Sequence, residues 1–308
     1  MVLGGFRFAE DDFSSNHWTL ETCLEKPRSW GLRTLPSDEP HFLKEIINTP
    51  WTDPMTDSFS RSFYPRQKTI VLSEADRLNW PTFSVARSRE VDRLAMEEFS
   101  VAGIELMRNA GAACADRLLA ELADRSRRTI VLTGAGNNGG DGYVIARCLA
   151  AASRPVRVYS LVPVEKLSGD ALLSYQDAVA AGVKIVVADS VDACREIDFR
   201  DSLIVDCLLG TGSQGAPRCP FAEVIERANA VPGDPSVRIH RVAIDVPSGF
   251  DGDSGEASDP TFRADLTLTF VTAKTGMRVP TASRSTGEIE IVDIGLPEEL
   301  KRRLGIPG

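Results

Sequence analysis

The stretch Val131-Leu-Thr-Gly-Ala-Gly-Asn-Asn-Gly-Gly-Asp-Gly-Tyr-Val-Ile-Ala-Arg147 decides the fold of this chain. It begins within a β-branched run, passes through five glycines between Gly134 and Gly142, and continues with apolar residues at helical spacing. This order predicts a strand, a tight glycine-rich turn and a helix that starts near residue 141. The free N–H groups and positive end of such a helix suit a phosphate or another anion.

The polar residues of the turn narrow down its ligand. The segment Gly134–Gly139 satisfies the dinucleotide pattern G-x-G-x-x-G, which also expects an acidic residue about 20 residues further on to hold a ribose. The next predicted strand, which begins at Val156, ends without one, and no Gly-Lys-Ser/Thr follows the loop. We therefore disfavour a dehydrogenase and a P-loop kinase. A turn without any ligand is also disfavoured, because turning a corner does not require two amides and a carboxylate.

Strands and helices alternate along most of the chain. Apolar periodicity predicts helices at 89–99, 104–122, 141–152, 168–181 and 220–229, and strands at 129–133, 156–161, 183–187, 203–206, 240–244, 266–270 and 288–292. This alternation predicts an α/β fold, a three-layer Rossmann-like sandwich with a mostly parallel sheet. Ligands of such sheets bind beyond the carboxyl ends of the strands, so we expect the glycine loop, Asp206, Gly210–Gly212, Asp245 and Lys274 to share one crevice.

The first part of the chain has a different character. Residues 1–83 contain all four tryptophans and scattered Pro, Ser and Asp, with little sustained periodicity. We predict an irregular or loosely packed N-terminal extension over 1–83 and an α/β domain over 84–308. The alternative is a docking arm whose tryptophans are buried on the domain or on a partner.

Composition bounds the function. The formal net charge of −9 argues against a nucleic-acid partner, because phosphates demand a surface rich in Lys and Arg. No run of about 18 apolar residues predicts a membrane span, and no basic start followed by an apolar stretch predicts a secretory signal. The six cysteines form no C-x-x-C pair, which indicates free thiols in a reducing compartment. We expect a cytoplasmic protein with a small-molecule substrate.

Several segments, taken in order, resemble one family. Gly136-Asn-Asn-Gly-Gly-Asp-Gly142 is similar to the hallmark of the NAD(P)H-hydrate epimerases, the YjeF N-terminal domain family. The other similar segments are Gly103-Ile-Glu-Leu-Met-Arg-Asn-Ala-Gly111, Asp206-Cys-Leu-Leu-Gly-Thr-Gly212, Ala243-Ile-Asp-Val-Pro-Ser-Gly249, Thr269-Phe-Val-Thr-Ala-Lys-Thr-Gly276 and Ile291-Val-Asp-Ile-Gly-Leu-Pro297. The resemblance runs from about residue 84 onward, and the order of its segments is more specific than any one of them.

The resemblance implies an isomerase of nicotinamide nucleotide repair. Its reaction would interconvert the R and S forms of hydrated NADH and NADPH (NADHX and NADPHX), which carry a hydroxyl at C6 of the nicotinamide ring. A general acid would assist departure of the hydroxyl, leaving a planar iminium-like carbon to which water returns from the other face. A ring-opened aldehyde is the competing route.

The resemblance also assigns residues. Asp245 is the first candidate for the acid or base, with Asp141 and Lys274 behind it. One potassium ion per subunit would be bound by Asn138, Asp206 and Ser248. The implied substrate contacts are Asn137, Asn138, Gly139, Gly140, Asp141, Gly210, Thr211, Gly212, Ser213, Gln214, Gly215, Ala216 and Asp245.

Simpler interpretations of these residues stay open. Asp206 and Ser248 would serve equally well as turn caps, and Pro247 is a candidate for a cis peptide bond. Lys274 follows Ala273 directly, where the family often has a proline between the two, so Lys274 is alternatively a solvated lysine at a strand end. A scaffold of the same fold, nucleotide- or RNA-associated and non-catalytic, is the alternative function, although the retained polar residues favour an enzyme.

Partners follow from the same resemblance. No second glycine-rich nucleotide motif follows the epimerase-like region, so we expect a separate dehydratase to act on the S epimer. We expect no nucleic acid and no membrane as partners. The sequence does not fix the oligomeric state, and a homodimer is the form we allow for.

Overall fold

The computed structural model describes residues 2–3, 6–7, 69–71, 80–122, 127–213 and 215–306. The chain divides into two compact units, Met1–Asn48 and Thr49–Gly308. In the first unit, strand β1 (Val2–Leu3) pairs antiparallel with β2 (Phe6–Arg7). Most of the predicted extension, including three of its four tryptophans, lies outside the described residues.

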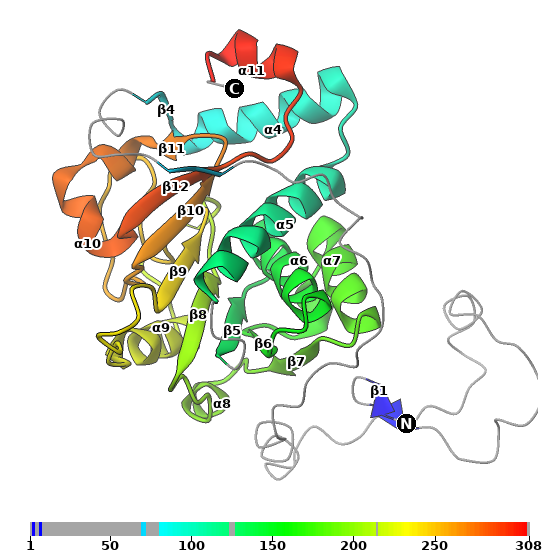
Figure 1. Ribbon diagram of the computed structural model, residues 1–308, viewed down its shortest axis with the longest axis vertical. Coiled ribbons are helices and arrows are strands. Elements are labelled where there is room, and N and C mark those ends of the chain that lie inside the picture. The colour runs from blue at the N-terminus through cyan, green and yellow to red at the C-terminus, as the bar shows by residue number, and fades with distance from the viewer. Residues whose placement is uncertain are drawn as a thin grey trace, which may run out of the picture. The chain divides into compact units, whose positions relative to one another are not determined.

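An eight-stranded sheet is the centre of the second unit (Figure 1), in the order β3-β12-β10-β9-β8-β5-β6-β7. Every adjacent pair is parallel except β3–β12. Starting at β5, the chain first adds strands toward β7 and then toward β12, so the strand order reverses between β5 and β8. The strands are β3 (Thr69–Val71), β5 (Arg128–Thr133), β6 (Val156–Ser160), β7 (Lys184–Val187), β8 (Ser202–Cys207), β9 (Arg241–Ile244), β10 (Leu266–Phe270) and β12 (Glu288–Val292).

Helices cover both faces of the sheet. Helices α5, α6 and α7 pack against one another on one side (Figure 1). Parallel crossovers are right-handed, so the reversal of strand order places α8 and α9 on the other side. The predicted three-layer α/β sandwich is therefore confirmed. The longer helices are α4 (Val85–Phe99), α5 (Gly103–Glu121), α6 (Asn137–Ala151), α7 (Gly169–Ala180) and α9 (Phe221–Ala230), and the shorter ones are α8 (Val191–Arg195), α10 (Ser283–Thr286) and α11 (Glu298–Leu304).

A small second sheet joins distant parts of the chain. Strand β4 (Thr82–Phe83) pairs in parallel with β11 (Ala273–Lys274), so Lys274 lies in register with Phe83. Short 3₁₀ turns at Val164–Lys166, Thr275–Arg278 and Pro280–Ala282 complete the secondary structure. Among the described residues, no helix combines the length and the apolar character that crossing a bilayer requires.

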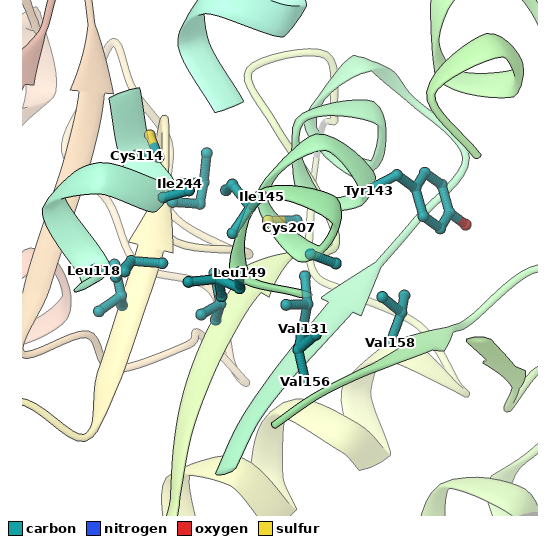
Figure 2. Packing of buried hydrophobic residues seen from close by; sticks show 14 of the residues in the cluster. Cys114, Leu118, Val131, Tyr143, Ile145, Leu149, Val156, Val158, Cys207 and Ile244 are labelled. Carbon is teal, nitrogen blue, oxygen red and sulfur yellow. The ribbon is translucent and has the colours of Figure 1, made fainter. Parts of the chain in front are cut away.

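The main hydrophobic core lies between α5, α6 and the central strands. Figure 2 shows Leu118 of α5, Ile145 and Leu149 of α6, and Val131 of β5 packed together. All four side chains are fully buried. Two of the free cysteines, Cys114 and Cys207, are buried in the same cluster. This core fixes α6, and with it the glycine-rich turn, against the sheet.

The predicted long helices and strands are present with their ends shifted by a few residues at most. At the glycine-rich turn, the predicted and observed helix starts differ by four residues, because α6 begins at Asn137 and not at residue 141. Gly139, Gly140 and Gly142 are therefore helical, and their missing side chains let this end of α6 pack closely against the preceding turn, α5 and the ends of β5 and β8. The short helices α8, α10 and α11 were not predicted, since four to seven residues carry too little periodicity.

Candidate active site

Two loops meet where the strand order reverses. One follows β5 and carries the glycine-rich motif; the other follows β8 and begins at Leu208. A Cβ atom added at Gly134 would lie 2.1 Å from Leu208 O, and one added at Gly210 would lie 3.1 Å from Asn138 Cβ. In open α/β sheets this crevice is where ligands bind. The glycines therefore bring the two loops into direct contact at the expected binding edge.

Four of the five glycines of the motif serve close packing and not unusual backbone angles. None of the five between Gly134 and Gly142 has a positive φ. A Cβ at Gly139 would lie 2.1 Å from Gly134 O, and one at Gly142 would lie 2.9 Å from Cys207 Cβ. Any side chain at these positions would push α6 away from the sheet. The positive φ that a glycine turn predicts occurs in the second loop, at Gly215.

The buried residues Asn138, Asp206 and Ser248 and the half-buried Leu209 form one hydrogen-bonded group, which we call the Asp206 cluster. The Asp206 carboxylate accepts hydrogen bonds from Leu208 N at 3.1 Å, Ser248 N at 2.8 Å and Ser248 Oγ at 2.7 Å. Leu209 N donates to Ser248 Oγ at 2.9 Å, and Asn138 Nδ2 donates to Leu209 O at 3.2 Å. The cluster ties together the loops that follow β5, β8 and β9.

The Asp206 cluster has unused capacity for a cation. Burial raises the pKa of Asp206 to about 6 from an ordinary 3.8, although its three hydrogen bonds act to lower it. Asn138 Oδ1 is buried and has no hydrogen-bond partner, which is costly for an amide oxygen. A carboxylate, an amide oxygen, a hydroxyl and a loop carbonyl are the kind of oxygen donors that hard cations take.

Asp245 occupies a strained turn at the end of β9. Its φ is +64°, a left-handed conformation that is uncommon outside glycine, and Val246 N donates back to Ile244 O at 2.9 Å. The neighbouring strand β10 ends in the same way, with Val271 at φ +67° and Thr272 N bonded to Phe270 O at 2.7 Å. Strained residues of this kind cluster at functional sites. The peptide bond before Pro247 is not among the cis bonds, which precede Pro220 and Pro260.

Lys274 is a buried ion-pair partner of Asp245. Its Nζ atom lies 2.6 Å from Asp245 Oδ1 and also donates to Thr269 Oγ1 at 3.0 Å and Phe270 O at 3.3 Å. Only 1% of Lys274 is exposed, so the alternative of a solvated lysine at a strand end is wrong. Pairing of β11 with β4 fixes the backbone at Lys274, and this holds the ammonium group between the ends of β9 and β10.

Two further carboxylates share this charged surrounding. Asp141, in the first turns of α6, is 6% exposed and accepts no hydrogen bond from a described residue. Burial, with the charges of Asp245 and Asp92, raises its pKa well above the ordinary 3.8. Burial and the charge of Asp245 raise the pKa of Asp92 to about 6, against the opposite effect of Lys274. We call Asp92, Asp141, Asp245 and Lys274 the charged cluster.

Sequence analysis did not single out Asp92. It lies in α4, beside the buried stripe formed by Val91, Leu94 and Ala95. In the sequence, Asp92 is recognisable only as an acidic residue next to the apolar face of an amphipathic helix. Many acidic surface residues occupy such positions, so this pattern does not predict a functional residue. Only the packing of α4 brings this residue into the electrostatic field of Asp245, Asp141 and Lys274.

The predicted substrate-contacting residues divide by exposure. Asn138, Gly139, Gly140 and Asp141 are buried, whereas Asn137 is exposed. In the second loop, Gly210 and Thr211 are half-buried, and Gly212, Ser213, Gly215 and Ala216 are exposed; Gln214 lies outside the described residues. The two loops contact each other, so the buried polar residues of α6 lie next to the more exposed residues of the second loop. A surface hollow lined by α9 and residues 257–263 contains none of the predicted site residues.

Comparison with known proteins agrees with this geometry. A family model described as "YjeF-related protein N-terminus" matches residues 103–276. An NAD(P)H-hydrate epimerase of Rhodopirellula baltica is 45% identical over 230 residues, covering 74% of this chain and 90% of the relative. One from Pirellula staleyi is 40% identical, covering 70% and 92%.

A longer relative and a solved structure also match this chain. A bifunctional NAD(P)H-hydrate repair enzyme of Pyrobaculum aerophilum is 42% identical, covering 69% of this chain but 41% of that longer protein. The crystal structure of a yeast protein has a TM-score of 0.59 at 22% identity, covering 74% of this chain and 96% of its own, and supports the fold alone. On the family match and the two epimerase relatives, the chain belongs to the YjeF-related N-terminal family.

Proposed function

We propose that this chain is an NAD(P)H-hydrate epimerase, an isomerase that interconverts the R and S forms of NADHX and NADPHX. The observation that carries the proposal is that the Asp206 cluster and the Asp245–Lys274 ion pair both lie at the carboxyl ends of the neighbouring strands β8, β9 and β10. A non-catalytic scaffold of the same fold would have no use for a buried ion pair beside two acids of raised pKa. The two relatives covered almost completely by this chain carry the same activity in their names.

The charged cluster supports a division of labour between its carboxylates. Asp245 forms an ion pair with Lys274, whereas Asp141 accepts no hydrogen bond from a described residue and burial raises its pKa well above the ordinary value. In our proposal, Asp141 protonates the departing C6 hydroxyl, which leaves as water. Asp245 then accepts a proton from the water that adds to the other face of the planar iminium-like carbon. Exchange with solvent returns the proton to Asp141, so the reaction consumes none.

This division refines the roles expected from the sequence. Asp245 was the first candidate for the acid or base, and here it is the base and the anion that stabilises the cationic ring. Lys274 positions Asp245 through their ion pair, and its Nζ atom is itself held by Thr269 Oγ1 and Phe270 O. Positioned acids and bases of this kind contribute on the order of 10²–10⁴-fold to a rate.

We also propose that the Asp206 cluster binds one potassium ion. Asn138 Oδ1, which is buried without a partner, fits the role of a ligand, as do the Asp206 carboxylate and Ser248. The bound ion would offset the desolvation of Asp206 and hold the loops after β5, β8 and β9 together. Replacing potassium by tetramethylammonium should then lower the melting temperature of the protein, and this readout does not depend on activity.

The biological setting is part of the same proposal. We propose a cytoplasmic enzyme that works beside a separate dehydratase specific for the S epimer, with a homodimer as the form to be tested. The bifunctional relatives are consistent with a shared pathway, because their names describe repair as one combined activity. Sedimentation of the full chain decides the oligomeric state.

One assay tests the function directly. Purified full-length protein is incubated with pure S-NADHX, and the R and S forms are separated by chromatography over time. The protein should bring the two forms to equilibrium far faster than buffer does. An Asp245→Asn variant that melts normally serves as the matched control. A ratio that drifts at the buffer rate with folded protein rejects the proposal and favours the scaffold.

A further inference from the structure

Two threonines of β10 lie on the same face of the sheet but have different partners. The two leucines of this strand belong to the main hydrophobic core, so Thr267 and Thr269, which alternate with them, point to the opposite face. Both threonines are fully buried. Thr267 Oγ1 donates to Thr286 O at 2.7 Å, whereas Thr269 Oγ1 accepts a hydrogen bond from Lys274 Nζ at 3.0 Å. One hydroxyl therefore contacts the backbone of the fold, and the other contacts a residue of the candidate site.

The Lys274 side chain folds back onto the strand that precedes it. The chain turns sharply at Val271, where φ is +67°, before Lys274 joins β11. The Nζ atom then donates back to Thr269 Oγ1 and, at 3.3 Å, to Phe270 O. Because only 1% of Lys274 is exposed, its ammonium group is buried at the carboxyl end of β10.

The same segment of β10 also holds the other member of the ion pair. Asp245 N donates to Leu268 O at 2.8 Å, and Asp245 Oδ1 lies 2.6 Å from Lys274 Nζ. Residues 268–270 therefore hold the backbone of Asp245 through one carbonyl, and the ammonium group through a second carbonyl and one hydroxyl. Three consecutive residues contact both partners, which makes β10 the common support of the ion pair.

The ammonium group depends on its acceptors for its direction. A lysine ammonium has three N–H donors on a flexible four-carbon stem, so the oxygens around it determine where it points. Three oxygen atoms lie within 3.3 Å of Nζ, one each from Thr269, Phe270 and Asp245. Loss of a buried acceptor leaves a donor unsatisfied, which is costly for a charged group. Of these three acceptors, the Thr269 hydroxyl is the one that a substitution removes without altering the backbone or the carboxylate.

The ion pair also orients the Asp245 carboxylate. Its Oδ1 atom is buried, yet 15% of the side chain is exposed, so the exposed surface belongs to other atoms of the side chain. Lys274 therefore contacts the buried oxygen of the carboxylate and leaves the rest of the group toward the exposed side. The second oxygen of a carboxylate held in this way is available to accept a proton.

We propose that Thr269 is a positioning residue of the epimerase site: its hydroxyl holds the Lys274 ammonium on Oδ1 of Asp245, so that the second carboxylate oxygen faces the substrate. The proposal rests on the proposed function only in giving Asp245 a part in the reaction. Thr269 is fully buried and acts through Lys274 without touching the substrate.

Two valine substitutions in the same strand separate positioning from packing. Thr269→Val keeps the shape of the side chain and removes an acceptor of Lys274, so the ammonium group is less well directed at Asp245. Thr267→Val is the matched control, because it removes an equally buried hydroxyl that donates to the backbone. Both variants should lose similar stability, and only Thr269→Val should disturb the site. Thr269→Ser retains the hydroxyl and should preserve the contact.

The first measurement needs no substrate. In protein labelled with ¹⁵N-lysine, NMR detects an ammonium group whose acceptors slow its exchange with water, and the Lys274 signal is assigned from its loss in Lys274→Met. This exchange should be about tenfold faster in Thr269→Val, because one protecting hydrogen bond is lost, and unchanged in Thr267→Val and Thr269→Ser. Lys301, whose Nζ atom lies 2.7 Å from Asp293 Oδ2, is the internal reference. Unchanged exchange in folded Thr269→Val, or a rapidly exchanging Lys274 in the unmodified protein, overturns the proposal.

The second measurement separates this proposal from the proposed function. Steady-state kinetics on S-NADHX are compared between the unmodified protein and the same variants. We expect kcat to fall by roughly 10- to 100-fold in Thr269→Val with little change in KM, which corresponds to one hydrogen bond to a charged group. Thr267→Val and Thr269→Ser should keep kcat near that of the unmodified protein.

The outcomes of the kinetic comparison are distinct. Equal losses of kcat in the two valine variants, or a loss that Thr269→Ser shares with Thr269→Val, indicate only structural damage and overturn the proposal. If the unmodified protein does not epimerise NADHX, the proposed function fails, and the ammonium exchange still decides whether Thr269 holds Lys274.

Discussion

Asp206 and Asp141 are two buried carboxylates at the same edge of one sheet, yet their surroundings differ. Asp206 is fully buried and accepts three hydrogen bonds, and its pKa is raised only to about 6. Asp141 is nearly as buried, accepts none from the described residues, faces two other carboxylates, and has a pKa raised well above the ordinary value. The two carboxylates therefore differ more in their hydrogen-bond donors than in their burial. The donors let Asp206 hold loops together, whereas their absence leaves Asp141 suited to proton transfer.

The strongest test of this contrast is Asp245→Asn, in the charged cluster. Asparagine tolerates the positive φ at this position, so the strained turn should persist, whereas alanine would add backbone strain. We expect kcat/KM to fall by about 10²–10⁴-fold with little change in KM, because a base acts mainly in the transition state. Steady-state kinetics on S-NADHX provide the measurement.

Substrate binding and melting temperature of Asp245→Asn serve as controls. If kcat stays near that of the unmodified protein, the base is another member of the charged cluster. If binding is lost along with turnover, Asp245 positions the substrate and the division of labour is incorrect.

The corresponding change in the Asp206 cluster should act on stability first. Asp206→Ala removes the acceptor of three hydrogen bonds and leaves Ser248 N buried without a partner. Each such bond contributes about 1 kcal/mol or more, so we expect a loss of about 3 kcal/mol in the free energy of unfolding. Urea denaturation with and without potassium measures both this loss and the ion's contribution.

Potassium should stabilise the unmodified protein and have a much smaller effect on Asp206→Ala. Asp245→Asn is the matched control, since it should keep the full response to potassium. Equal responses in all three proteins would show that the two clusters do not differ in the way proposed.

Truncation should disturb the charged cluster and spare the Asp206 cluster. Removal of residues 1–48 deletes a separate compact unit and should change melting little. Removal of residues 1–83 also deletes β3, the antiparallel edge strand of the main sheet, and β4, the partner of the Lys274 strand. Trp80 O and Pro81 O, which accept from Arg278 and Thr272, are lost as well. We expect the longer deletion to cost about 1–2 kcal/mol and to lower kcat, by analogy with the loss of a few buried hydrogen bonds.

Differential scanning calorimetry and the epimerase assay compare the two truncations. The stabilisation by potassium should survive in both. Identical melting and turnover for the two would mean that β4 contributes nothing to holding Lys274.

The smallest effect expected is a gain in stability from Asp141→Asn. The folded pKa of Asp141 lies above its ordinary value of 3.8, so the proton-linked stability is complete below that pH and is lost as pH rises through the folded pKa. Asparagine avoids this loss. We expect Asp141→Asn to match the unmodified protein near pH 4 and to exceed it by about 1 kcal/mol, a few degrees in melting temperature, at alkaline pH.

Melting temperature measured from pH 4 to pH 9 checks the sign. Asp206→Asn is the matched control and should be destabilised at neutral pH, because an amide cannot replace a carboxylate toward three donors. A destabilised Asp141→Asn at alkaline pH would mean that Asp141 has hydrogen-bond partners that place it with Asp206.

Much of the fold was predictable because it depends on local pattern. The alternation of strand-like and helix-like hydrophobic patterns predicted the ends of β5, β8, β9 and β10 within a residue or two. The start of α6 was misplaced because glycine propensity argues against a helix, whereas packing of bare backbone against β5 and β8 favours one here.

The sequence by itself determined the layered α/β architecture, the strand ends at which Asp206 and Asp245 lie, and membership of the family. These follow from periodicity and from short motifs, whose information is local. Tertiary structure alone decided that Lys274 is buried against Asp245, that Asp245 is held at positive φ, and that Asp92 joins Asp141 in one field. The burial of Lys274 depends on the pairing of β4 with β11, strands about 190 residues apart in the sequence that meet only when the domain is assembled (Thr82 pairs with Ala273). Charge coupling requires such proximity, and no local pattern encodes it.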